Sequence, residues 1–177
     1  MSSTFKFKFS ENFISKEVKE GYNGYLSQNY GETLDDISDV INSTVQGVTI
    51  PSMNVVHPSL QRFKKSSVHG NELMERELII DFRKIDGNIN FYAITEEAFR
   101  QYDKSGNSDD ELFIGDCYMD VFSKRGITIF NIIFKDCVLT NIELPDFTFH
   151  EVEPAEEQFS VTLEWNDLNI IPLPDQK

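Results

Sequence analysis

Strict alternation of apolar and polar residues is the clearest pattern along the chain, and it is typical of β-strands with one buried face. It begins at 5–9 (FKFKF), where Phe5, Phe7 and Phe9 share one face. It is cleanest at 159–165 (FSVTLEW), where every second residue is large and apolar. Further strands are predicted at 48–51, 77–85, 88–93, 113–122, 127–134 and 136–144.

Turn residues connect these segments into hairpins. Asp86-Gly87 is a typical two-residue hairpin turn, so 77–85 and 88–93 are expected to pair antiparallel. Residues 123–126 (SKRG) are expected to turn the chain into 127–134. Because 127–134 is apolar on both faces, we expect it to lie in the centre of the sheet or to be covered on both faces.

A period of nearly four residues predicts three short helices. In 14–26 an apolar residue recurs at every fourth position. The second helix, 33–46, begins with a capping box made by Thr33 and Asp36. The third is 96–102, directly after the predicted hairpin.

The order of elements predicts a single domain over 1–177. It comprises a 1–32 N-terminal extension, a long arm at 52–76 without regular pattern, and an exposed, flexible tail at 172–177. Antiparallel strands joined by short turns indicate a mainly β fold. The expected architecture is an antiparallel β-barrel or two-sheet sandwich, with flanking short helices and a long protruding arm.

The charge is strongly negative, with 16 Lys and Arg against 30 Asp and Glu, or −14. This excess disfavours tight binding of nucleic acid through a basic face. Segment 57–71 is the exception, because it carries Arg62, Lys64 and Lys65 and no acidic residue. The arm of one subunit could therefore bind the acidic flank of the next, or it could be a solvated loop.

Several compartments and classes are disfavoured. No run approaches the ~20 apolar residues of a membrane-spanning helix, so no membrane partner is expected. The alternating N-terminus lacks the continuous apolar stretch of a signal peptide, which favours a protein that is intracellular or assembled inside a cell. Cys117 and Cys137 are too few for a disulfide framework and are expected to be small buried residues.

No pattern of catalytic or ligand-binding residues is evident. The three histidines, none at metal-ligand spacing, are His57, His69 and His150. The acidic loop 103–111 resembles a calcium loop in its alternate acids, but Ser108 replaces the required glycine and Ile114 the closing glutamate. Adjacent acids such as Glu96 and Glu97 are expected to be solvated. We therefore expect no enzyme and no catalytic residue, cofactor or metal.

Four segments, in their order along the chain, are similar to those of one known family. They are 45–51 (VQGVTIP) after helix 33–46, the hairpin 77–92 leading into a short helix, 133–142 (IFKDCVLTNI) and 159–170 (FSVTLEWNDLNI). Together they resemble the tail tube proteins of contractile-tailed bacteriophages and, more distantly, the tube protein of type VI secretion systems. The resemblance covers roughly residues 40–170.

The resemblance implies a subunit that forms hexameric rings, which stack head to tail into a hollow tube in the virion tail, assembled in the host cytoplasm. Strands of neighbouring subunits would join into one barrel, which also covers their edges. The arm would contact the next subunit or ring. Expected partners are further copies of the chain and the tail sheath, baseplate or terminator proteins. DNA would pass through the lumen without specific binding, because carboxylates repel phosphates.

The residues expected to act in assembly fall into two groups. The inter-subunit arm would use Arg62, Lys64 and Lys65. The charges considered for the lumen, which lie at outward positions of the hairpins, are Asp81, Arg83, Asp116, Asp120 and Lys124. The alternatives are a tail adaptor, hub or completion ring that does not polymerise, and the tube of a contractile injection or secretion system. A small acidic binding module and an enzyme are the alternatives from other classes.

Overall fold

The computed structural model describes residues 4–30, 36–50, 76–104, 113–143 and 158–173. These residues form seven strands, three α-helices and one short 3₁₀ turn. In chain order they are β1 (Thr4–Lys8), α1 (Lys16–Tyr30), α2 (Ile37–Ser43), β2 (Val45–Thr49), β3 (Glu77–Arg83), the turn η2 (Asp86–Asn88), α3 (Ile89–Lys104), β4 (Phe113–Phe122), β5 (Thr128–Ile142), β6 (Gln158–Glu164) and β7 (Asp167–Pro172).

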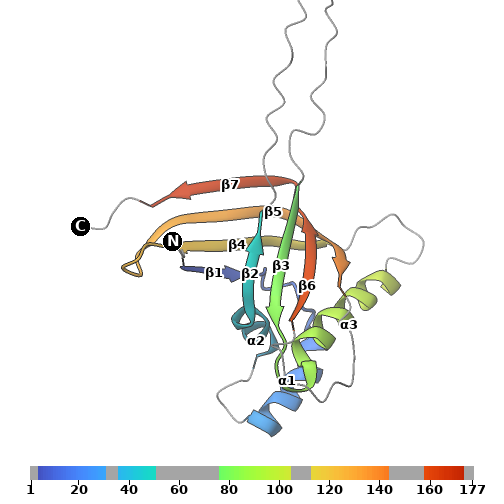
Figure 1. Cartoon of the computed structure of the whole chain (residues 1–177). Helices are drawn as coiled ribbons and strands as arrows, with labels where there is room; N and C mark the ends of the chain where they lie inside the picture. The colour runs from blue at the N-terminus through green and yellow to red at the C-terminus, as the bar shows by residue number, and fades with distance from the viewer. Residues whose placement is uncertain (1–3, 31–35, 51–75, 105–112, 144–157, 174–177) are drawn as a thin grey trace, which may run out of the picture.

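All seven strands belong to one antiparallel sheet, in the order β1-β4-β5-β6-β3-β2, with β7 paired to β5. The first part of β5 pairs with β4 and β7, and its last part pairs with β6. Two halves result, which cross at a steep angle in Figure 1. We call β1, β4, β7 and residues 128–135 of β5 the ribbon. The other half consists of β2, β3, β6 and the end of β5.

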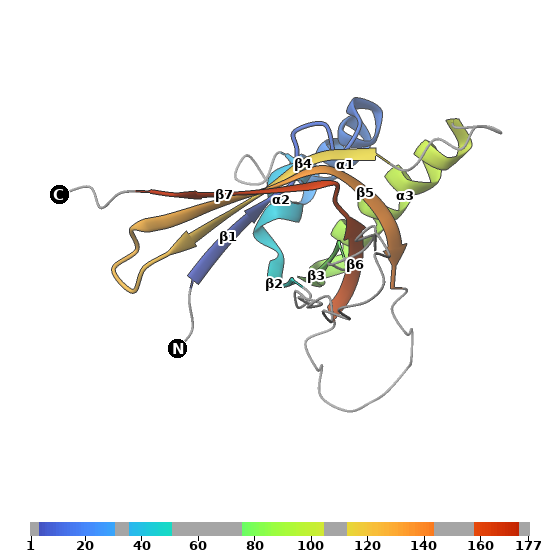
Figure 2. The same ribbon diagram turned by 90° about the horizontal axis from the view of Figure 1, so that it is seen from above.

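The expectation of a mainly β, antiparallel fold is confirmed, but a closed barrel is not found within one chain. Among the described strands, β1 and β2 end the sheet on its two sides and do not pair with each other. The ribbon extends away from the three helices (Figure 2). The subunit is therefore an open, sharply bent sheet.

The bend is built into β4 and β5. Gly115 and Asp136 both have left-handed backbone, with φ of 94° and 52°, and the register between the two strands shifts there. The Asp136 N–H donates to a carboxylate oxygen of Asp116 at 3.1 Å, which holds the shifted pairing. The sequence predicted two strands, 127–134 and 136–144, but they form one long strand, β5, with a bulge. The predicted central position of 127–134 is confirmed, because this part of β5 lies between β4 and β7.

Stacked aromatic rings form the middle of the core. Phe82 of β3 lies between Phe9 and Phe159, with ring centroids 5.9 Å and 4.9 Å away. The alternation of 5–9 and 159–165 is confirmed, because their large apolar side chains are buried or packed on the core. Cys117 and Cys137 are free and buried, as expected.

The predicted hairpin at Asp86-Gly87 is wrong. Gly87 and Asn88 have positive φ, and the chain then enters α3 rather than a return strand over 88–93. The apolar residues of 88–93 alternate as in a strand, but the buried residues Asn90, Ala93 and Glu97 lie three and four positions apart, on one face of α3. The Asn90 side chain donates to the backbone oxygen of Arg83 at 2.8 Å and fixes this turn.

The other two helices were foreseen with different limits. α1 spans Lys16–Tyr30 instead of 14–26, and it buries Val18 and Leu26 as its apolar period predicts. α2 is shorter than predicted and begins at Ile37. Asp36 caps this helix, because its carboxylate accepts a hydrogen bond from the Ser38 N–H at 2.8 Å. Thr33 lies outside the described residues. None of the described helices is long and apolar enough to cross a membrane.

Candidate assembly surfaces

The ribbon presents two free edges. Within the described part of the chain, β1 pairs only with β4, and β7 pairs only with β5. Each of these strands therefore leaves one row of backbone N–H and C=O groups without a strand partner. Edges of this kind favour pairing with another chain unless something covers them.

Apolar side chains are exposed along the ribbon and its turn. Ile170 and Ile171, on opposite faces of β7, are 51% and 39% exposed. The other large apolar residues exposed here are Tyr118, Ile127, Phe130 and Leu173. An isolated chain thus leaves apolar surface on both faces of the ribbon, which is typical of a surface that another subunit covers.

The outward face of the ribbon also carries ordered charge. Asp120 lies in register between Lys6 of β1 and Asn131 of β5, and the Asn131 amide donates to it at 2.5 Å. Asp116 lies on the same face of β4 and accepts the Asp136 N–H at the bend. The acids of this face are therefore interspersed with basic residues of β1.

The remaining candidate lumen charges lie elsewhere. Asp81 of β3 points away from the core, where it accepts a hydrogen bond from the Ser160 hydroxyl at 2.7 Å. Arg83 is exposed at the end of β3, and Lys124 is exposed in the turn between β4 and β5. The structure brings Asp81, Asp116 and Asp120 to the face opposite the core; their role in a lumen stays a prediction.

The predicted arm 52–76 lies outside the described residues except for Arg76. Arg62, Lys64 and Lys65 are among those outside. Arg76 precedes β3 and is held in place by Asn166: its guanidinium donates to the backbone oxygen and the side-chain oxygen of Asn166 at 3.0 and 3.2 Å. The backbone N–H of Trp165 donates to the backbone oxygen of Arg76 at 3.0 Å. These contacts hold the corner between β6 and β7, and no pattern in the sequence predicted them.

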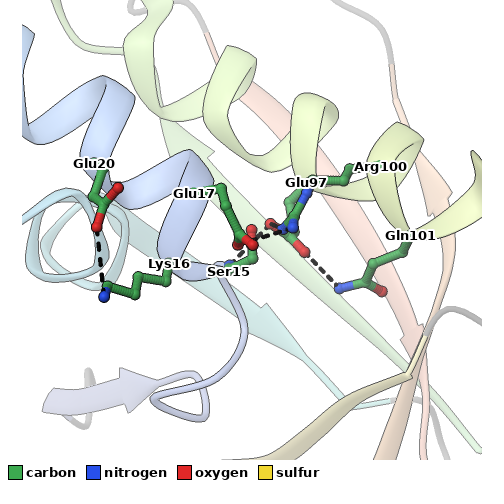
Figure 3. A network of polar contacts seen from close by, with 7 residues as sticks. All are labelled: Ser15, Lys16, Glu17, Glu20, Glu97, Arg100 and Gln101. Atoms are coloured by element: carbon green, nitrogen blue, oxygen red, sulfur yellow. Dashed lines mark hydrogen bonds and ion pairs between the residues drawn. The ribbon is translucent and has the colours of Figure 1, made fainter. Parts of the chain in front are cut away.

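A buried carboxylate joins α1 to α3 (Figure 3). Glu97 is only 3% exposed, which corrects the expectation that it is solvated. It accepts the Ser15 N–H at 2.9 Å, at the start of α1, and the Gln101 amide at 3.0 Å. Arg100 completes the network through an ion pair of 2.8 Å with Glu17. Glu97 therefore caps α1 from the neighbouring helix.

No family of known proteins and no curated protein matches the sequence. Among solved structures, a type six secretion system protein matches over 96% of this chain and 83% of its own, with 8% identity and a TM-score of 0.51. Hcp1 from Salmonella typhimurium matches over 97% of this chain and 93% of its own, at 10% identity and a TM-score of 0.46. The secreted protein Hcp3 from Pseudomonas aeruginosa matches over 97% and 91%, at 10% identity and a TM-score of 0.47.

At such low identity the likeness concerns the fold. This likeness agrees with the resemblance of the four sequence segments, which extends to the tube protein of type VI secretion systems. The chain has the fold of this type six secretion system protein.

Proposed function

We propose that this chain is the tail tube subunit of a contractile-tailed bacteriophage, a structural protein that forms hexameric rings stacked head to tail. The observation that carries the proposal is the ribbon. Among the described strands, β1 and β7 each have one unpaired edge, and apolar side chains of the ribbon are exposed on both faces. A head-to-tail interface between identical subunits covers such edges and closes into a ring.

The charge supports a channel for DNA. A chain of net charge −14 repels phosphates, so a genome would pass through a lumen of such subunits without specific binding. The ring would lie in the virion tail, with sheath, baseplate and terminator proteins as its partners. The same fold in a type six secretion system protein agrees with an assembly of this general kind.

Electron microscopy in negative stain, with sedimentation velocity on the same sample, tests the proposal. Purified chain at micromolar concentration, with or without tail baseplates as a template, should give tubes with six-fold rings. Rings that never lengthen into tubes would instead indicate an adaptor, hub or completion ring. A chain that stays monomeric in the presence of baseplates would contradict the proposal.

A matched pair of variants tests the role of the ribbon. Replacing Ile170 and Ile171 together by Lys should abolish rings, because two charges would be buried at the new strand interface. Both side chains are exposed in the single chain, so its far-UV circular dichroism should not change. Phe99→Lys is the control, since Phe99 is 65% exposed but lies on α3, away from the ribbon. Rings at wild-type yield from the Ile170/Ile171 variant would refute the ribbon interface.

A further inference from the structure

A groove of about 460 Å³ runs between α1 and α3, and Glu17, the ion-pair partner of Arg100, is among the residues that line it. Three tyrosines and two acids line much of it, namely Tyr22, Tyr25, Tyr92, Glu17 and Glu96. The rings of Tyr25 and Tyr92 are about half exposed, at 48% and 46%. Exposed aromatic faces beside carboxylates attract cations, and arginine and lysine side chains are the cations that proteins supply.

A hydrogen bond fixes the position of the Glu96 side chain beside the groove. The Tyr22 hydroxyl donates to a carboxylate oxygen of Glu96 at 2.9 Å. Burial, together with this bond to Glu96, raises the pKa of Tyr22 well above its ordinary value. The phenol therefore stays protonated as a donor, and the Glu96 side chain is held beside the groove with further acceptor sites.

A glycine keeps the groove open. Gly21 of α1 lines it, and a Cβ built on Gly21 would meet no atom within 4 Å. Gly24 of the same helix is equally open but does not line the groove. The absence of a side chain at Gly21 thus leaves room for one from another segment, although glycine weakens the helix.

The position of the groove relative to the arm suggests which segment enters it. The 25 residues 51–75 connect the end of β2 to Arg76, which precedes β3. β3 then runs about 23 Å to η2 and α3, so the end of β2 and the start of β3, which this segment connects, lie at the opposite end of this half of the sheet from η2 and α3 (Figure 1). In a head-to-tail stack along the direction of β3, the end of one subunit at which β3 starts would face the end of the next subunit that carries the groove.

We propose that the groove between α1 and α3 binds the basic segment 57–71 of a neighbouring copy of this chain. Arg62, Lys64 and Lys65 would lie over the tyrosine rings and beside Glu96. This inference rests on the proposed function, because stacking supplies the neighbouring copy. It names the site that receives the arm.

Peptide binding tests the site apart from tube formation. The receptor is the full chain carrying R62E, K64E and K65E, so that its own arm does not compete. A fluorescent peptide of residues 57–71 should bind it, with an affinity that falls as salt rises. Gly21→Leu, which fills the groove, should weaken binding at least tenfold. Gly24→Leu, the matched control on the same helix, should bind as the parent does.

Charge in the groove and the direction of docking need two more measurements. Glu96→Gln should weaken peptide binding several-fold without unfolding the protein. A bis-maleimide should join a Gly21→Cys copy to a Lys64→Cys copy, because thiols add to both maleimides without redox chemistry. Covalent dimers are expected from this mixture. Cross-linking confined to one chain, in the doubly substituted protein, would place the arm in its own groove and overturn the proposal.

The outcomes separate this site from the proposed function. Peptide binding that is equal in Gly21→Leu and Gly24→Leu, or absent in the parent receptor, overturns the groove as the arm site. If such protein still forms tubes, the tube function stands without this site. Peptide binding that is lost only in Gly21→Leu supports the site, even in a chain that forms no tubes.

Discussion

Removal of the Glu97 side chain is expected to be among the most damaging single changes outside the aromatic core. The carboxylate is 3% exposed and accepts hydrogen bonds from the Ser15 N–H and the Gln101 amide. Glu97→Ala deletes a charge-assisted bond, worth about 1.5–3 kcal/mol, and leaves a partly buried N–H without an acceptor, at about 1–3 kcal/mol. We expect a loss of about 3–5 kcal/mol in the free energy of unfolding.

The ion pair contributes little to this figure. Arg100 lies 3.9 Å from Glu97 but 2.8 Å from Glu17, so it keeps its nearer partner in the variant. The Glu17 side chain is 68% exposed, and pairs of that kind contribute about 0–1 kcal/mol. The expected loss therefore comes from the cap on α1.

Urea unfolding followed by far-UV circular dichroism measures this loss, and Glu97→Gln and Glu96→Ala are the controls. Glutamine retains an oxygen for the Ser15 N–H, and its loss should be about 1 kcal/mol. Glu96→Ala removes only an exposed carboxylate and the bond from Tyr22. The reasoning is refuted if Glu97→Ala unfolds at the same urea concentration as Glu96→Ala.

Four further predictions concern stability. Trp165→Ala should cost about 3–5 kcal/mol, because the indole is buried against Phe134; a melting temperature equal to wild type would contradict this. Gly21→Ala should gain up to about 1 kcal/mol in thermal unfolding, because its Cβ meets open space. Asp136→Val should cost about 1–2 kcal/mol at its φ of 52°, whereas Asp136→Gly should not, and equal unfolding midpoints would exclude backbone strain there. The neighbouring Cys137 thiol and burial raise the pKa of Cys117 well above its ordinary value, so the folded protein keeps a proton that the unfolded chain loses. The free energy of unfolding should therefore fall as the pH rises past the ordinary pKa of a thiol, and less so in Cys117→Ala.

The sequence was a good guide wherever one face of an element is buried inside the subunit. The strands at 5–9 and 159–165 were predicted because their alternation matches their burial. At 88–93 the same rule failed, since Ile89, Phe91 and Ala93 are spaced by two yet are all buried in a helix. Packing against the sheet overrode the local pattern and the hairpin turn.

The candidate surfaces were harder to predict for a physical reason. β7 has little alternation to detect, because apolar Ile170 and Ile171 are exposed on both of its faces. Its pairing with β5 also depends on the corner held by Arg76 and Asn166, which are 90 positions apart. Patterns of burial within one chain do not report surfaces that another chain would cover.

The continuity of β5 has a mechanical consequence. Residues 128–142 form one strand that passes from the ribbon into the helix-bearing half through the bulge at Asp136, with no flexible linker between them. A pull or twist applied to the ribbon is therefore transmitted along a single hydrogen-bonded backbone to β6 and the helices packed behind it. If ribbons join subunits into a ring, deformation of the ring would load this strand in tension, and the bulge is the point at which it would first yield.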